Sequence, residues 1–184
     1  MKDKDLTIKV RDNLIMRTQV VGDAPQMFLT IDKNRKYLRE WLTWVDNTVT
    51  VEDIELSIKK TQGIDKDAKD IILGILFDNI HVGNLGIHNI DRRRDSAMIG
   101  YLLAENYQGK GIMTDCVKAA VNYCFGGLNL NSIHISCAES NKKSRAVPER
   151  LNFIQEGILQ DGLKYHGIYH NEVVYGIVKR NWNG

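Results

Sequence analysis

The chain has 184 residues, of which 43% are hydrophobic and 26% charged, and its formal net charge is +2 at pH 7. This length and apolar content suit one globular domain with a buried core, which we expect to span residues 1–184. The charge lacks the basic excess of a dedicated nucleic-acid-binding protein, and no uninterrupted apolar stretch approaches the length of a membrane span. We therefore expect neither nucleic acid nor membrane among the partners.

The three cysteines are Cys116, Cys124 and Cys137. They form no Cys-x-x-Cys pair, and their apolar spacing indicates burial in a core rather than disulfides, zinc ligands or an acetylated nucleophile. The first residues are charged and lack the apolar segment of a secretory signal. These features predict a reducing, cytoplasmic location and no bound metal.

Apolar residues that alternate predict strands, and apolar residues spaced by three and four predict helices. In chain order these patterns predict strands at 6–10 and 14–18, helices at 25–38 and 51–62, strands at 71–77, 82–90 and 97–103, a helix at 113–124, a strand at 133–137, a helix at 141–150, and closing strands at 153–159 and 168–178. We expect the three middle strands to form a meander and residues 162–167 to form the turn between the closing strands. This order predicts a mixed α/β layer fold.

Local capping residues support three of the helix starts. Pro25 suits the first turn of a helix. Thr50 and Asp53 form a capping box in which aspartate replaces the usual glutamate. Asn141 is a good N-cap for the helix that runs toward Arg150.

Residues 107–114 read Tyr-Gln-Gly-Lys-Gly-Ile-Met-Thr and lie between a predicted strand and a predicted helix. Gly109 and Gly111 allow the backbone to approach an anion closely, and the first N–H groups of a helix point toward such an anion. The P-loop spacing is absent, and the dinucleotide fingerprint would need a glycine where Thr114 stands. The segment is therefore a simple turn, or a seat for another phosphate such as the pyrophosphate of coenzyme A.

The order of these elements, with the segments 108–114 and 141–147, resembles the GNAT acetyltransferases. Within that superfamily the chain is most similar to the RimJ/RimL branch, which acetylates the N-terminal amines of ribosomal proteins. Met113 departs from the general motif, which prefers Gly or Ala, but methionine is familiar in this branch. The resemblance covers nearly the whole chain, including residues 34–42, 99–101, 152–153, 156–157 and 169–170.

This resemblance implies a GNAT fold, with a mostly antiparallel, twisted central sheet flanked by helices. The strand at 99–103 is expected to splay from the strand at 133–137 and to leave unpaired backbone groups for the amide-rich arm of the cofactor. The implied cofactor is acetyl-CoA, used without a metal. Its expected binding residues are Tyr101, Leu102, Leu103, Gln108, Gly109, Lys110, Gly111, Ile112, Met113, Thr114 and Asn141.

Acetyl transfer from a thioester needs a proton for the departing thiolate, and the resemblance points to Ser144 as the general acid. Asn141 and Ser144 match the Asn-x-x-Ser of the family, so Asn141 is expected to position the cofactor arm. The alternative is that Asn141 is only an N-cap. Pro148 lacks the N–H that would normally bond to the Ser144 carbonyl, which leaves that carbonyl free.

The general base is the least determined group. RimL-like enzymes have a glutamate on the strand after this helix, and Leu163 stands at the matching position. Asp161 lies two residues earlier, on the same face of a regular strand, so we expect it to serve as the base unless it is a solvated turn residue. Glu105, His88 and a chain of water molecules are the other candidates.

Three aromatic residues near the start of the chain, Tyr37, Trp41 and Trp44, line the acceptor side or anchor the first helices onto the sheet. The expected activity is acetyl-CoA-dependent N-acetylation by direct attack of an amine, most simply the N-terminal α-amine of a ribosomal protein. Two alternatives stay open: acetylation of a small amine such as a polyamine or an aminoglycoside, and a non-catalytic module that binds acyl-CoA. The resemblance also implies a homodimer.

Overall fold

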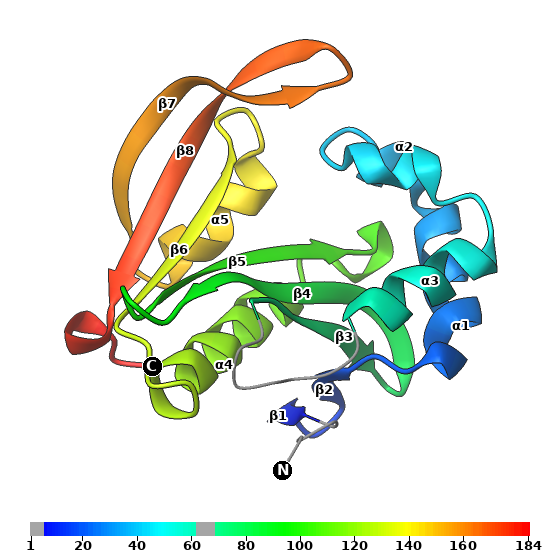
Figure 1. The fold of residues 1–184 in the computed structure, drawn as a ribbon, viewed down its shortest axis with the longest axis horizontal. Helices are drawn as coiled ribbons and strands as arrows, with labels where there is room; N and C mark the ends of the chain where they lie inside the picture. The colour runs from blue at the N-terminus through cyan, green and yellow to red at the C-terminus, as the bar shows by residue number, and fades with distance from the viewer. Residues whose placement is uncertain (1–5, 62–68) are drawn as a thin grey trace.

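The computed structural model describes residues 6–61 and 69–184 and contains one eight-stranded sheet (Figure 1). The strand order is β1-β2-β3-β4-β5-β6-β8-β7, and every pair is antiparallel except β5 with β6. The strands are β1 Thr7–Arg11, β2 Leu14–Thr18, β3 Ile71–Phe77, β4 Ile80–Asp91, β5 Ser96–Leu103, β6 Ser132–Ala138, β7 Ile154–Tyr165 and β8 Ile168–Val178. The predicted mixed α/β fold with a mostly antiparallel sheet is confirmed.

Five α-helices and four short 3-10 helices accompany the sheet in the described part of the chain. They are α1 Ala24–Lys33, α2 Arg35–Leu38, α3 Val51–Thr61, α4 Ile112–Gly126 and α5 Lys142–Arg150, with η1 Val21–Asp23, η2 Thr43–Asn47, η3 Glu105–Tyr107 and η4 Lys179–Asn181. Each of these α-helices is too short or too polar to cross a membrane. The capping box of α3 forms as expected, since the Asp53 N–H donates to Thr50 Oγ1 at 3.3 Å and the Thr50 N–H donates to Asp53 Oδ2 at 2.9 Å.

The sheet separates two hydrophobic cores. The buried stripe of α4, which includes Cys116, Val117 and Ala120, packs with the central strands in the larger core. The smaller core joins α1, α2, η2 and α3. Side chains alternate along a strand, so Leu103 of β5 belongs to the larger core and its neighbour Leu102 to the smaller one.

The parallel pair β5 and β6 stays together only at one end. Ser96, Ala97 and Met98 pair with Ser132, Ile133 and His134, and no pairing follows. Beyond that point β6 pairs with β8 and leans away from β5 (Figure 1). The predicted splay is therefore confirmed, and it leaves the cleft-facing edges of both strands without strand partners.

The closing hairpin differs from the prediction. β7 continues through Tyr165, and its turn consists of His166 and Gly167 alone, so the prediction of a turn over residues 162–167 is wrong. The register shifts between Leu159 and Leu163, where β7 carries a bulge with Asp161 at φ +52°. The polar Gln-Asp-Gly sequence of this bulge imitates a turn.

Candidate active site

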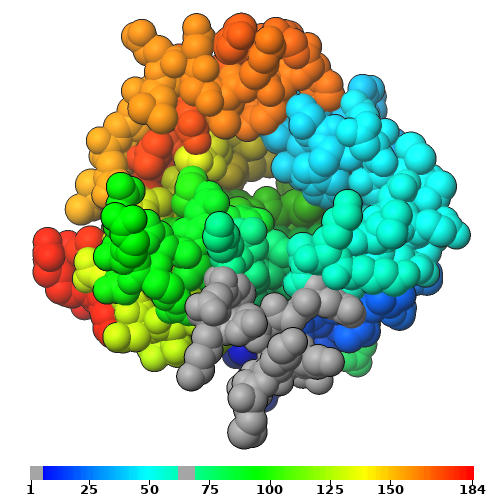
Figure 2. Space-filling model, viewed as in Figure 1, coloured from blue at the N-terminus to red at the C-terminus, as the bar shows by residue number. Residues whose placement is uncertain are grey.

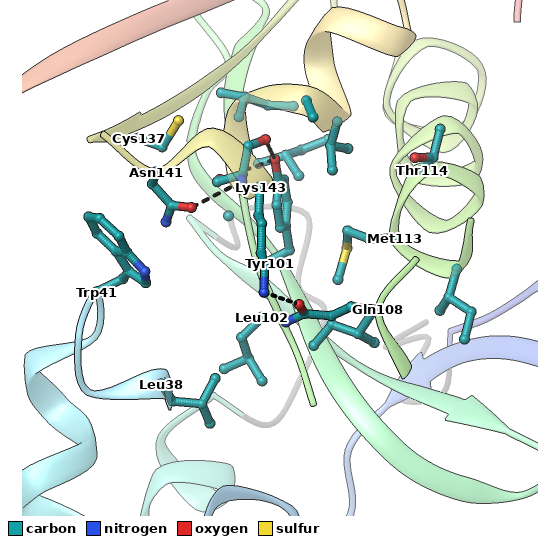
Figure 3. A pocket seen from close by; sticks show the side chains of 18 of the residues that line it. Leu38, Trp41, Tyr101, Leu102, Gln108, Met113, Thr114, Cys137, Asn141 and Lys143 are labelled. Atoms are coloured by element: carbon teal, nitrogen blue, oxygen red, sulfur yellow. Dashed lines mark hydrogen bonds between the residues drawn. The ribbon is translucent and has the colours of Figure 1, made fainter. Parts of the chain in front are cut away.

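A cleft of about 800 Å³ lies where β5 and β6 part. Its walls come from β5, the end of β6, the first turns of α4 and α5, and the α2 segment (Figure 3). Most of the expected cofactor residues line it, namely Tyr101, Leu102, Leu103, Gln108, Gly109, Gly111, Ile112, Met113, Thr114 and Asn141. Lys110 is the exception, because its ammonium lies 5.0 Å from the centre of the Tyr107 ring and the residue does not line the cleft.

The glycine turn, residues 108–111, ends at the N-terminus of α4. Gly109 and Gly111 have φ values of +72° and +75°, a left-handed conformation that side chains with a Cβ rarely adopt. The Asp115 N–H donates to the Gly111 carbonyl at 3.0 Å, so the three N–H groups before it precede the hydrogen-bond ladder of the helix. These groups and the helix dipole favour an anion at this end of the cleft.

Asp115 is the one carboxylate on the cleft wall in the described chain, and it lies in the first turn of α4. The Arg11 guanidinium donates to Asp115 Oδ2 at 2.8 Å. This ion pair offsets the negative charge that would otherwise oppose an anion at the glycine turn.

Two hydroxyl groups meet on the other side of the cleft. Tyr101 Oη donates to the Ser144 carbonyl at 2.8 Å, and Ser144 Oγ lies 3.4 Å from Tyr101 Oη. The Ser144 carbonyl is free for this bond because Pro148, four residues on in α5, has no N–H. Burial raises the pKa of the Tyr101 phenol far above its usual value, against a smaller lowering by its hydrogen bond with Ser144, so both hydroxyls stay protonated at neutral pH.

The sequence singled out Ser144 but did not predict that the Tyr101 hydroxyl would lie beside it. The sequence did contain a signal for this contact, since a proline inside the predicted helix follows Ser144 by four residues. A carbonyl freed in this way needs another donor if it is buried. A tyrosine on the facing strand could have been predicted for that role.

Asn141 lies at the N-terminus of α5 and accepts a hydrogen bond from the Ser144 N–H at 3.1 Å. The capping alternative is therefore observed. The cap holds the backbone of Ser144 in place. Asn141 also lines the cleft. A cofactor contact of Asn141 stays a prediction.

Cys137 also lines the cleft, at the end of β6, although its alternation with Ile135 indicated a purely structural position. Burial raises the pKa of its thiol more than the hydrogen bond with Ser144 lowers it, which keeps the thiol protonated and a poor nucleophile. Cys116 and Cys124 are fully buried in the larger core, and burial raises the pKa of each to about 12.

The candidate bases lie outside the cleft. Asp161 is exposed in the β7 bulge, where its N–H donates to Asn171 Oδ1 at 3.3 Å. Neither Glu105 nor His88 lines the cleft, and His88 Nδ1 lies 3.3 Å from Asp70 Oδ1. The residues described contain no cluster of three or more His, Cys, Asp or Glu side chains that could hold a metal ion.

Aromatic residues border the end of the cleft near α2 and the closing hairpin, and an acceptor role for them stays a prediction. Tyr37 and Trp41 line the cleft together with Tyr165 from the tip of the β7–β8 hairpin. Trp44 does not line it and is 40% exposed. Trp41, Tyr165 and His170 form an aromatic bridge, with ring centres 6.2 Å apart for Trp41–Tyr165, 6.4 Å for Trp41–His170 and 5.4 Å for Tyr165–His170.

A hydrogen bond closes this bridge, since His166 Nε2–H donates to the Arg39 carbonyl at 2.6 Å. The hairpin tip thereby touches the segment that follows α2, although the two are far apart in sequence. Figure 2 shows the result as an opening near the middle of the molecule, bordered by the orange hairpin, the cyan α2 segment and the green strands. The cleft is therefore encircled and has no open side at the hairpin.

The family model described as an acetyltransferase (GNAT) domain matches residues 13–154. The chain belongs to the GNAT acetyltransferases. It is an enzyme that transfers the acetyl group of acetyl-CoA to an amine. "Putative ribosomal N-acetyltransferase YdaF" of Bacillus subtilis (strain 168) is 35% identical over 179 residues, which are 97% of this chain and 98% of that protein.

Two solved structures of GNAT enzymes resemble the whole chain. The self-immunity acetyltransferase MccE, in complex with acetyl-CoA and AMP, is 28% identical with a TM-score of 0.87, and the match covers 92% of this chain and 94% of that one. RimL, a ribosomal alpha-N-protein acetyltransferase in complex with coenzyme A, is 24% identical with a TM-score of 0.88, and the match covers 94% and 98%. The expected likeness to the RimJ/RimL branch is confirmed.

Proposed function

We propose that this acetyltransferase modifies the N-terminal α-amine of a protein, with a ribosomal protein as the first candidate. The observation that carries the proposal is the encircled cleft. A folded surface does not pass the contact between the hairpin and the α2 segment, whereas a chain end is thin enough to enter. The name of the Bacillus relative supplies the ribosomal candidate.

For the cofactor, we propose that the pyrophosphate lies against the glycine turn and the first N–H groups of α4. The pantetheine arm then follows the unpaired edge of β5 and hydrogen-bonds to it as a missing strand would. This pose directs the thioester toward Tyr101 and Ser144. Asn141 supports the arm from the opposite wall.

For the chemistry, we propose direct attack of the free amine on the thioester carbonyl. The carbon–nitrogen bond forms, the carbon–sulfur bond breaks, and the thiolate takes a proton from Ser144. The Ser144 hydroxyl regains its proton from water, and Tyr101 Oη, which accepts a hydrogen bond from Ser144 Oγ, holds that hydroxyl in place. Asp161 takes the proton of the amine through water, since its carboxylate lies outside the cleft.

A polyamine or aminoglycoside acceptor finds less support in the cleft. Polycations need carboxylates, and the carboxylate on the described cleft wall, Asp115, is already paired with Arg11. A non-catalytic acyl-CoA module would have no use for two hydroxyl groups at the site of the thioester. Both alternatives become outcomes of the test below.

We propose a homodimer in the cytoplasm and one catalytic domain over residues 1–184. The edge strand β7 supports the dimer, because it carries the exposed apolar residues Ile154, Ile158 and Leu159. One continuous sheet supports the single domain, and three free cysteines suit a reducing compartment. Light scattering after size exclusion tests the dimer, and a mass of one chain, 21.0 kDa, would contradict it.

The deciding experiment is thiol release from acetyl-CoA with a panel of N-terminal peptides, polyamines and aminoglycosides. Turnover with the peptides alone is the expected result. Turnover with the small amines alone contradicts the proposal. Thermal stabilisation by acetyl-CoA without turnover of any acceptor indicates a binding module.

A further inference from the structure

Lys143 extends from the first turn of α5 across the cleft toward Gln108 (Figure 3). Its Nζ donates to Gln108 Oε1 at 2.9 Å and lies 5.1 Å from the centre of the Tyr37 ring. Gln108 belongs to the glycine turn, and Tyr37 belongs to α2. One side chain therefore joins three of the segments that border the cleft.

Both of these partners are neutral. An amide oxygen and an aromatic face attract an ammonium group less strongly than a phosphate oxygen does, because hydrogen bonds between two charged groups are the stronger ones. The position of Lys143 is also unfavourable for a cation in itself. It follows Lys142 in the first turn of α5, a turn without an acidic residue, where the helix dipole opposes positive charge.

The Lys143–Gln108 hydrogen bond also crosses the path that the proposed pose gives to the cofactor. The pantetheine arm must run from the glycine turn to the Tyr101 and Ser144 hydroxyls, and Lys143 spans the space between α5 and that turn. The bond must therefore open, or turn toward the cofactor, before the thioester reaches the site.

We propose that Lys143 is a latch that the cofactor opens, an inference that rests on the proposed seat of the pyrophosphate at the glycine turn. In the free enzyme the ammonium holds Gln108 and the Tyr37 ring. When pyrophosphate occupies the turn, the ammonium moves to the phosphate oxygens and releases Tyr37. The acceptor side then opens, so the cofactor binds before the acceptor.

Calorimetric titration with two probes, acetyl-CoA and S-acetylpantetheine, tests the first half of the proposal. S-acetylpantetheine carries the same thioester without the pyrophosphate. Lys143→Met should weaken acetyl-CoA binding by about tenfold, the effect of one lost hydrogen bond between charged groups. It should leave the affinity for S-acetylpantetheine unchanged or higher, and Lys143→Arg should retain most of the acetyl-CoA affinity.

Lys142→Met is the matched control, because Lys142 adds the same charge to the same helix turn without lining the cleft. Its affinity for both probes should equal that of the wild type. Equal acetyl-CoA affinity in Lys143→Met and the wild type overturns the proposal. An equal loss for both probes in Lys143→Met also overturns it, because Lys143 would then only support the local structure.

Tyr37→Leu tests the second half, since it removes the resting partner and spares the lysine. The loss of an exposed cation–π contact should tighten acetyl-CoA binding by about threefold. Unchanged or weaker binding would make Lys143 a phosphate ligand and not a latch. A wild-type protein that binds neither probe would instead contradict the proposed function, so the two failures are distinguishable.

Discussion

Ser144 and Tyr101 bring two protonated hydroxyl groups to the point where β5 and β6 part. Tyr101 is held mainly by the Ser144 backbone carbonyl, which Pro148 leaves free, and not by the Ser144 hydroxyl. Each hydroxyl can therefore be removed while the other keeps its place. Single substitutions can therefore test the proposed role of each hydroxyl separately.

Ser144→Ala should lower kcat by about ten- to a hundredfold, at the low end of general-acid effects because Tyr101 stays nearby. The affinity for acetyl-CoA should change less than twofold, since the cap uses the Ser144 N–H and survives the substitution. Single-turnover kinetics and calorimetry measure the two quantities. Ser140→Ala, an exposed serine just before the helix, is the control. An unchanged kcat would remove Ser144 from the mechanism.

Asp161→Asn should lower kcat by about tenfold if this carboxylate accepts the amine proton through water. The loss should be smaller at high pH, where a larger fraction of the acceptor amine is already unprotonated. A pH–rate series from neutral to alkaline conditions measures this trend. A rate profile equal to that of the wild type would assign Asp161 a structural place in the β7 bulge.

The start of α4 depends on a glycine that no other residue replaces without strain. An added Cβ at Gly111 would meet only Asp115 Oδ2, at 3.9 Å, so the strain of a substitution comes from its φ of +75°. Gly111→Ala should lower the free energy of unfolding by about 1 kcal/mol and weaken acetyl-CoA binding as the turn distorts. Urea unfolding and calorimetry measure the two effects.

Gly126→Ala provides the comparison at the other end of the same helix. An added Cβ there meets no heavy atom within 4 Å, and alanine favours the helical state. Its stability should equal or exceed that of the wild type, with unchanged affinity. Equal behaviour of the two variants would contradict the special role of the left-handed turn.

At the level of whole elements, hydrophobic periodicity and capping residues were sufficient to predict the strands and helices, because both signals are local. The predicted helix over residues 25–38 is interrupted at Asn34, which lies between the end of α1 and the start of α2. The bulge in β7 was also missed. Leu159 pairs with Glu172 and Leu163 pairs with His170, so β7 advances by four residues where β8 advances by two. The rule that residues two apart share a face of the sheet therefore fails at Asp161.

At the level of the whole molecule, the encircled cleft depends on contacts between segments far apart in sequence. The glycine turn and Ser144 could be predicted because a short motif marks each of them. The contact of His166 with Arg39 and the packing of Trp41 on Tyr165 have no local signature. Only the fold brings the hairpin tip to the α2 segment.

Trp41→Ala should open this contact and raise the KM for a peptide acceptor by about tenfold, with kcat and acetyl-CoA affinity little changed. The reason is that the indole contacts the hairpin and lines the end of the cleft where we propose that the acceptor enters. Steady-state kinetics with the best peptide of the panel measures the effect. Trp44→Ala, which alters an exposed ring outside the cleft, is the control. A rise in the acetyl-CoA Kd alone would contradict an acceptor role.

Pro148 carries a consequence for how this sequence can evolve. A proline inside a helix is about 3 kcal/mol less favourable than alanine, yet here it keeps the Ser144 carbonyl available to Tyr101. Random variants selected for heat resistance alone should therefore replace Pro148, whereas variants selected for heat resistance and turnover together should retain it. Sequencing both pools measures the difference, and equal replacement in the two would contradict it. Retention of Pro148 under the second selection alone would show that part of the stability open to this sequence is given up for turnover.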